Sequence, residues 1–400
     1  MKNRTILRCT LSAAICSCCL FPAQVFAASS AETSSAENSQ ITDFSVKLFQ
    51  ASMEDGANTL ISPLSVLSAL SMTANGAAGS TLEQMENVFG LPVTELNEYF
   101  SRYLSEEDDS LSIANSVWIN DSSGLPVSPD FTEAVSDFYQ ADWFEEPMDG
   151  ETLRKINDWV KEKTEGMIPQ ILDEIPEGAL MYLINALTFQ AKWEEVYEDY
   201  DVYEGIFTEE EGTELENAMM RSTESTYLEG ESAEGFLKYY EGGEYAFAAL
   251  LPDESIPLDE YAESLTGEEL REILSEKKTD YTVHAEIPKF TSETETELSQ
   301  ALKDMGMTDA FSDNADFSGL FDTESNPGFQ ISRVIHKTFI EVNEQETKAS
   351  AATAVEIAET AYLPDETEKY ISLNRPFLYM LVDCEENIPL FIGTMYTPEE

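Results

Sequence analysis

Hydrophobic residues recur at two spacings along this chain, helical in the first half and strand-like in the second. A helix is predicted to begin at Ser62-Pro63 and to end toward Gly76, because Ser is a favoured N-cap and Pro suits the first helical position. A capping-box pattern, Ser80-Thr-Leu-Glu83, predicts a second helix closed by Gly90. A third helix, ending near Gly166, is predicted from an apolar stripe at helical spacing: Leu153, Ile156, Trp159 and Val160.

The strand predictions start with a continuous apolar run at residues 179–189, which we expect to be buried on both faces. Further strands are predicted at 245–251 and 281–287, with a C-terminal hairpin of 377–382 and 390–395. Apolar residues are spread evenly from residue 41 to residue 396, with no second linker or internal repeat. The pattern predicts one large α+β domain.

Residues 331–360 change character halfway along. The first part alternates as a strand does, with one face formed by Val334, His336, Thr338, Ile340 and Val342. The second part holds the small residues 349–354, with no Gly and no Pro, and cannot form a core of its own. It should therefore be an exposed loop, yet each of its residues could enter a β-sheet. A loop that can become a strand indicates a function based on conformational change.

The N-terminus has the features of a secretory signal. Lys2, Arg4 and Arg8 precede an uncharged apolar run, and Val25-Phe26-Ala27 offers small residues where a signal peptidase cuts. A membrane anchor is less favoured because the run is short and contains Pro. We expect residues 1–27 to be removed and 28–40 to be a polar, disordered linker before a domain at 41–400. Export is compatible with release or with retention at the cell surface.

Composition narrows the choice of partners. The formal net charge is −56, which repels nucleic acid and anionic membranes, and no Lys/Arg cluster could bind a heparin-like polyanion. The charge is explained by solubility or, alternatively, by faster encounter with cationic partners. Only Cys384 lies outside the signal, so the exported chain has no internal disulfide and we expect a monomer held by its core.

The sequence gives little support for an enzymatic function. The two histidines, His284 and His336, lie in strand-like runs, where histidine is usually a hydrogen-bonded core residue. Outside the predicted signal no HExxH, CxxC or Gly-rich phosphate loop occurs, so we predict no metal site and no cofactor. Among 78 acidic residues close carboxylate pairs arise by chance, so a hydrolase with an acidic dyad is only a distant alternative. We predict no enzyme and no catalytic residue.

Eight strings follow one another in an order and spacing that resemble the serpin family, whose inhibitory members are suicide inhibitors of proteases. The resemblance covers residues 41–397. The strings are NTLISPLSVLSAL, GAAGSTLEQM, INDWVKEKTEGMIPQIL, LINALTFQAKW, PKF…LSQALKDMGMTDAF…ADFSGL, HKTFIEVNE, NRPFLYML and PLFIGTMYTP. The resemblance implies helices around a large central mixed β-sheet, smaller sheets and an exposed reactive-centre loop at about 344–368.

The resemblance also assigns roles to individual positions. Four residues match the polar cluster where the central sheet parts: Ser62, Ser65, Asn185 and His336. Three match the top of that sheet, where the loop enters: Trp193, Lys289 and Glu344. It implies an ion pair between Lys289 and Glu344 and a packing role for Trp193. For each of these residues plain structural support is the alternative.

The reactive bond follows from counting along the loop. In the family it lies after the residue sixteen places beyond the one matched by Glu344, which gives Thr360-Ala361. The preceding subsite residues would be Ile357, Ala358 and Glu359. A small β-branched residue at the cut favours elastase-like or subtilisin-like serine proteases and disfavours trypsin-like ones. A cut near Tyr362-Leu363 would suit chymotrypsin-like enzymes instead.

Insertion of the cut loop as a strand requires one uncharged face. The inward set would be Thr347, Ala349, Ala351, Thr353 and Val355, all small or β-branched. The opposite set carries its charges near the ends: Lys348, Ser350, Ala352, Ala354 and Glu356. At the hinge the family usually has Gly, whereas this chain has Glu346, which predicts slower insertion. The pattern favours an inhibitor; the alternative is a non-inhibitory binding or storage protein that is merely cut.

Overall fold

The computed structural model describes residues 23–105, 110–322, 328–344 and 367–398, with side chains described from residue 35 onward. The chain divides into two compact units at Ala36/Glu37, within helix α1 (Ala23–Ser52). All other elements belong to the second unit, Glu37–Glu400. No helix within the described ranges is long and apolar enough to cross a membrane.

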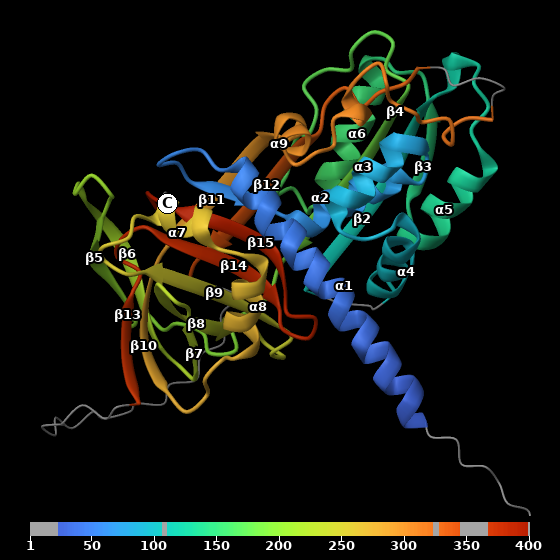
Figure 1. The fold of residues 1–400 in the computed structure, drawn as a ribbon. Coiled ribbons are helices and arrows are strands. Elements are labelled where there is room, and N and C mark those ends of the chain that lie inside the picture. The colour runs from blue at the N-terminus through green and yellow to red at the C-terminus, as the bar shows by residue number, and fades with distance from the viewer. Residues whose placement is uncertain (1–22, 106–109, 323–327, 345–366, 399–400) are drawn as a thin grey trace, which may run out of the picture. The chain divides into compact units, whose positions relative to one another are not determined.

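Helices and strands both occur along the second unit, with helices concentrated before residue 165 (Figure 1). The remaining helices are α2 (Pro63–Ala74), α3 (Gly79–Phe89), α4 (Val93–Tyr103), α5 (Pro129–Tyr139), α6 (Gly150–Lys163), α7 (Leu258–Ser264), α8 (Gly267–Ser275) and α9 (Ser299–Asp304), with 3-10 turns η1 (Asp121–Ser123) and η2 (Asp309–Phe311). The first strands are β1 (Thr59–Ile61), β2 (Leu111–Asn120), β3 (Asp142–Glu146), β4 (Met181–Phe189), β5 (Val202–Thr208), β6 (Glu214–Glu224), β7 (Thr226–Glu229) and β8 (Ala233–Tyr239). The later strands are β9 (Tyr245–Pro252), β10 (Thr282–Pro288), β11 (Phe290–Glu297), β12 (Ile335–Val342), β13 (Glu368–Ser372), β14 (Phe377–Asp383) and β15 (Ile388–Met395).

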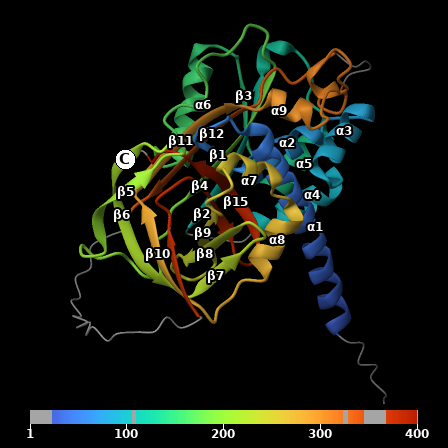
Figure 2. The same cartoon turned by 60° about the vertical axis from the view of Figure 1, so that its left-hand side comes forward.

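Four sheets organise these strands. A six-stranded antiparallel sheet has the order β1-β15-β14-β9-β8-β7, and a four-stranded sheet has the order β13-β10-β6-β5. Two smaller sheets are β3-β2-β4 and the pair β11-β12. Figure 1 places α2, α5 and α6 with β2 and β3, and places β7 to β10 at the opposite end of the unit; in Figure 2, turned by 60°, β2 overlaps β8 and β9. The α+β prediction is confirmed. The expected central mixed sheet is present as two separate pieces, β3-β2-β4 and β11-β12.

The main core lies on the six-stranded sheet. All residues of β9, β14 and β15 are buried, because the strands are apolar except at Asp383 and Thr394 and each is paired on both edges. The predicted C-terminal hairpin of β14 and β15 is confirmed. A second, smaller core gathers Ile156, Trp159 and Val160 of α6 against Trp118 and Ile184, so the predicted stripe on α6 is also confirmed.

Several local expectations need correction. Helix α3 begins at Gly79 with Ala78 as N-cap, so the capping box is wrong: Ser80 lies inside the helix, where its hydroxyl donates to Asp309 Oδ2 at 2.7 Å. Strand β4 is not buried on both faces, because one of its edges borders a cavity. His284 is half buried and stacks on the ring of Tyr370 instead of lying in a core.

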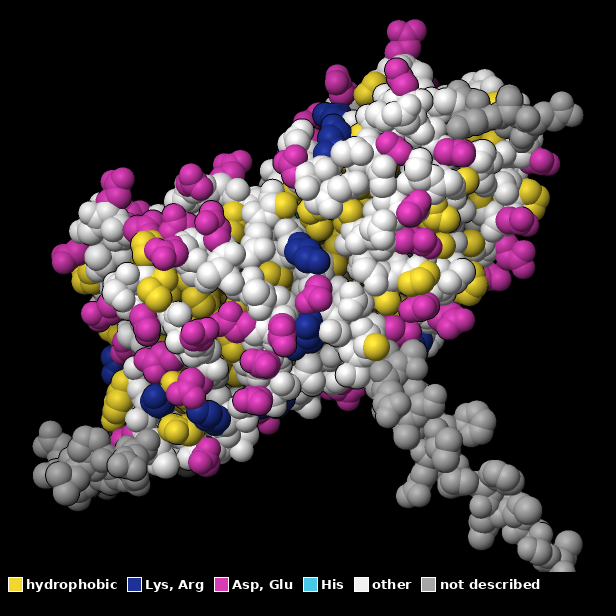
Figure 3. All heavy atoms as spheres, viewed as in Figure 1, with side chains coloured by type: hydrophobic (Ala, Val, Ile, Leu, Met, Phe, Trp, Pro, Cys, Tyr) yellow, Lys and Arg dark blue, Asp and Glu magenta, His cyan; other side chains and the backbone are white. Residues whose placement is uncertain are grey.

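The residues just before the domain are more ordered than a linker would be. Residues 37–40 are part of α1, and the Glu37 carboxylate is buried 2.9 Å from the Arg102 guanidinium. On the face drawn in Figure 3, Asp and Glu side chains are spread over the surface, with few Lys and Arg side chains between them. This distribution agrees with the formal charge of −56.

Candidate functional site

The candidate site is the opening between β4 and β12. Strand β4 pairs with β2 on one edge, and β12 pairs with β11 on one edge. Within the described part of the chain neither strand has a partner on its other edge. Such edges present unpaired backbone N–H and C=O groups, which are a template for another strand.

The two strands are joined at their C-terminal ends. The indole N–H of Trp193, shortly after β4, donates to the carbonyl of Asn343, directly after β12, at 3.0 Å. Beyond it, the Lys289 ammonium lies 2.6 Å from the Glu344 carboxylate. Burial is the largest single influence and by itself would raise the pKa of Glu344, but the hydrogen bond and positive charge of Lys289 and a backbone hydrogen bond together outweigh it, and the pKa is lowered. The carboxylate therefore stays ionised at neutral pH.

The opposite part of the opening is hollow. A cavity of about 430 Å³ is lined by the first half of β4, by α2 and by residues 328–336. Its walls include Ser65, Asn185 and His336, three of the four residues predicted to cluster there. Because both strands meet at their C-terminal ends and line the cavity with their N-terminal halves, they run in the same direction. A segment that turned back from the end of β12 into this space would be antiparallel to both.

The fourth residue of the cluster, Ser62, is tied to His336. The backbone N–H of Ser62 donates to His336 Nε2 at 2.9 Å, so Nε2 carries no proton and the neutral ring is protonated at Nδ1. Burial lowers the pKa of His336 to about 4, which keeps the ring neutral. Next to it, the Thr338 hydroxyl donates to the carbonyl of Leu60 at 2.9 Å. These bonds fix the N-terminal half of β12 to the segment that precedes α2.

Asn115 of β2 is the hub of the polar network below β4. Its side-chain oxygen accepts from Asn185 Nδ2 at 2.8 Å and from the Ser68 hydroxyl at 3.1 Å, and its amide donates to the carbonyl of Tyr139 at 2.8 Å. Two buried atoms in this region, Ser62 Oγ and Asn185 Oδ1, have no hydrogen-bond partner among the described residues. Such atoms cost free energy, so a rearrangement that pairs them is favoured.

Trp193 is held by an aromatic cluster with a buried cation. Its ring stacks on Tyr240 at a centroid distance of 4.3 Å. The ammonium of Lys238 is only 1% exposed and lies 3.0 Å from a Glu224 carboxylate oxygen. It also lies 5.3 Å from the centroid of the Trp193 ring and 4.4 Å from that of Tyr197. An ammonium between a carboxylate and aromatic rings fixes the position of the Trp193 indole.

The structure thus brings the two predicted groups, Ser62 with Ser65, Asn185 and His336, and Trp193 with Lys289 and Glu344, to the two ends of one opening. The other predicted positions lie outside the described residues: Glu346, Thr347, Ala349, Ala351, Thr353, Val355, Ile357, Ala358, Glu359, Thr360 and Ala361.

Sequence reasoning missed Asn115, Lys238 and Tyr240. A signal existed for the first two, because each is a polar residue next to large apolar residues of its strand: LSIANSVWIN for Asn115 and AEGFLKY for Lys238. No local pattern distinguishes Tyr240 among the 17 tyrosines of the chain.

Comparison with known proteins agrees with this architecture. A family profile described as Serpin (serine protease inhibitor) matches residues 39–398. The chain is 33% identical to human serpin B8, over 89% of this chain and 97% of that protein. It is 30% identical to an uncharacterised serpin-like protein of Thermococcus kodakarensis, over 90% of this chain and 85% of that protein.

A solved structure shows the same fold at higher identity. The thermophilic serpin tengpin in its native state superposes with a TM-score of 0.81 and 42% sequence identity, covering 90% of this chain and 94% of that one.

Proposed function

Because the chain belongs to the serpin family, we propose that it inhibits serine proteases by inserting its own cleaved loop between β4 and β12. The observation that carries the proposal is the opening itself. It combines two strand edges without partners in the described residues, a cavity of about 430 Å³ and buried polar atoms that lack hydrogen bonds. No catalytic role is proposed for any residue of this chain.

The loop supplies a bond for the protease to attack. The protease serine would add to the carbonyl carbon of Thr360, the bond to Ala361 would break, and the Ala361 amine would leave with a proton. Thr360 would then be joined to the protease by an ester. Water normally hydrolyses this ester, so inhibition requires that the loop move before hydrolysis occurs.

Insertion supplies the driving force for that movement. A loop strand lying between β4 and β12 would form about ten backbone hydrogen bonds at roughly 0.5–1.5 kcal/mol each, on the order of 10 kcal/mol in total. The intact protein is then held by kinetics, since Trp193 and the Lys289–Glu344 pair close the end at which the loop must enter.

The target class follows from Thr360. Because a small β-branched residue leaves the buried acid of a trypsin-like pocket unpaired, we propose elastase-like or subtilisin-like targets. The charge of −56 favours targets with a cationic surface. We further propose that residues 1–27 are a signal, that the monomeric domain 41–400 acts outside the cell, and that it needs no cofactor.

The experiment is incubation of the exported chain with an elastase-like protease, followed by denaturing, reducing gel electrophoresis. A band at the summed mass that survives boiling is the expected result. Thr353→Arg should abolish this band and leave only cleaved chain, because residue 353 must face the core. Ala352→Arg, one position away on the outward face, should keep it. Wild-type chain that is only shortened, by a protease that stays active, would exclude trapping and favour a non-inhibitory protein.

Glu346 can be tested in the same assay. Glu346→Gly should lower the number of inhibitor molecules consumed per protease inactivated, because Gly makes the hinge more flexible. An unchanged ratio would show that Glu346 does not slow insertion.

A further inference from the structure

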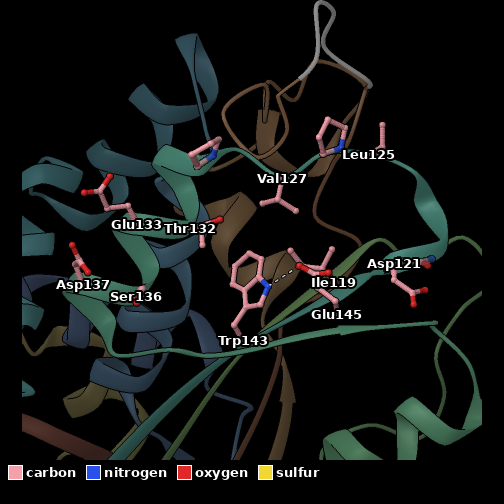
Figure 4. Close-up of a pocket in the computed structure, with 13 residues that line it drawn as sticks. Ile119, Asp121, Leu125, Val127, Thr132, Glu133, Ser136, Asp137, Trp143 and Glu145 are labelled. Atoms are coloured by element: carbon pink, nitrogen blue, oxygen red, sulfur yellow. Dashed lines mark hydrogen bonds between the residues drawn. The ribbon is translucent and has the colours of Figure 1, made fainter.

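We propose that a second cavity, formed by the end of β2, by β3 and by α5, binds an organic cation: an ammonium or guanidinium group on an apolar body. This cavity, drawn in Figure 4, has a volume of about 660 Å³ and shares no lining residue with the cavity in the opening described above. A volume of this size is typical of sites for small organic ligands. The proposal does not depend on protease inhibition.

The lining provides both an apolar surface and negative charge. The indole of Trp143 lies in the middle of the cavity, with Val127 above it and the α5 residues Thr132 and Ser136 to one side (Figure 4). Aliphatic surface comes from Ile119, from Leu125 and Pro126 of the loop, and from Pro129 at the start of α5. The lining contains four acids and no Lys or Arg; the acids are Asp121, Glu133, Asp137 and Glu145. The acidic side chains therefore suit the cationic group of a ligand, and the apolar lining suits its apolar body.

The strongest argument comes from a neighbouring arrangement in the same chain. The indole N–H of Trp159 donates to Asp142 Oδ2 at 3.0 Å. The ammonium of Lys163 lies 3.3 Å from that same oxygen and 5.6 Å from the centroid of the Trp159 ring. Trp, carboxylate and cation form a closed set of three contacts.

Trp143 repeats two parts of this set. Its indole N–H donates to Glu145 Oε1 at 3.3 Å, as the dashed line in Figure 4 shows. The third part has no counterpart, because no Lys or Arg of the described ranges lies over the Trp143 ring. Lys238 is a second cation of this chain that is held between a carboxylate, that of Glu224, and aromatic rings, those of Trp193 and Tyr197. At Trp143 a ligand would supply the cation.

The test is calorimetric titration with phenethylammonium, with 2-phenylethanol as the neutral compound of matching shape. At about 0.15 M salt, exposed charges more than about 8 Å apart are largely screened, so general attraction to an acidic surface is reduced. We expect the ammonium to bind at least about fivefold more tightly than the alcohol, the size of effect that cation–π contacts give. Equal affinity for the two compounds would overturn the proposal.

Variants locate the binding site. Glu145→Gln keeps an acceptor for the Trp143 indole N–H and removes only the charge, and it should weaken ammonium binding about threefold to tenfold. Glu98→Gln makes the same change of charge on α4, at an exposed residue outside the cavity, and should leave affinity within about twofold. Equal weakening by both variants would mean non-specific attraction and would also overturn the proposal. Trp143→Leu should abolish the preference for the ammonium over the alcohol.

A peptide separates the two sources of such a cation. Acetyl-Gly-Phe-Lys-Gly-amide presents a lysine on a polypeptide, and its form with acetylated lysine is the control. Tighter binding of the unmodified peptide than of phenethylammonium assigns the site to a basic side chain of a partner protein. Binding of phenethylammonium alone assigns it to free amines. A peptide that binds equally well with acetylated lysine would contradict recognition of a cation.

Discussion

In the six-stranded sheet, β9, β14 and β15 are paired on both edges and every residue of the three is buried. In the opening, β4 and β12 are paired on one edge only, as far as the described residues extend, and five of the nine residues of β4 are half buried. The strands of the two regions are similar in length, but β12 alternates polar and apolar residues, whereas β9, β14 and β15 are almost wholly apolar. The backbones also differ. The central strands of the six-stranded sheet are hydrogen-bonded on both edges, whereas β4 and β12 each have one edge without a partner strand among the described residues.

This contrast shows that stability is distributed unevenly in the molecule. Burial and pairing fix the six-stranded sheet, so changes there should affect unfolding. The opening is held by a few side-chain contacts at its two ends, so changes there should affect which strand occupies it. Four predictions test this division, the strongest effect first.

A synthetic peptide with the sequence of residues 347–360 should occupy the opening and stabilise the protein strongly. About ten backbone hydrogen bonds correspond to roughly 10 kcal/mol, enough to raise the midpoint of thermal unfolding by more than about 10 °C. The midpoint is measured by circular dichroism with and without peptide. A peptide with residues 351 and 356 exchanged has the same composition but places a carboxylate on the inward face, and should give no shift. Equal shifts from both peptides would show binding elsewhere.

Shortening a leucine should cost much more in the six-stranded sheet than at the opening. Leu381 of β14 is fully buried, so Leu381→Ala should lower the free energy of unfolding by about 3 kcal/mol. Leu183 of β4 is half buried at the cavity, so Leu183→Ala should cost about 1 kcal/mol. Urea unfolding of both variants measures the difference. Similar losses would show that the opening is packed as tightly as the sheet.

His336 should make stability fall in mild acid. Burial lowers its pKa from 6.5 in the unfolded chain to about 4. The unfolded state therefore binds more protons between these values, and stability falls as the pH drops from 6.5 to 4. At pH 5 the loss amounts to about 2 kcal/mol.

The matched variant is His336→Gln, whose side-chain oxygen can accept from the Ser62 N–H but does not titrate. Urea unfolding at pH 7 and pH 5 should show a smaller loss for the variant than for the wild type. The same loss in both would assign the acid sensitivity to other groups.

The Lys289–Glu344 pair should have the smallest effect on stability. Both side chains are 28% exposed, so removing the pair should cost less than about 1 kcal/mol. The lowered pKa of Glu344 means that this contribution is present above its ordinary value of 4.5 and is lost as the pH falls through the lowered value. A double-mutant cycle with Lys289→Gln and Glu344→Gln measures it. A coupling energy as large as that of a buried pair would contradict the expectation that this pair holds the end of the opening only weakly.

Part of the site could be predicted because it depends on local sequence. Alternation of polar and apolar residues places His336, Thr338 and Val342 on one face of β12, and the structure confirms this face as buried. Ser62 and Pro63 start α2 as expected, although the Ser62 side chain makes no cap hydrogen bond. The family resemblance named the residues at both ends of the opening, and their contacts agree with it.

The amino-acid pattern alone therefore specifies the order of elements, the faces of the strands and the uncharged set within 347–355. The folded molecule adds that β4 and β12 stay apart, that Asn115 joins the polar network and that Trp143 meets Glu145 at a cavity whose lining holds no Lys or Arg. These features depend on residues brought together from distant parts of the chain or on the space left between them. Local patterns fix the direction in which a side chain points, but cavities and unpaired edges arise only when whole elements pack.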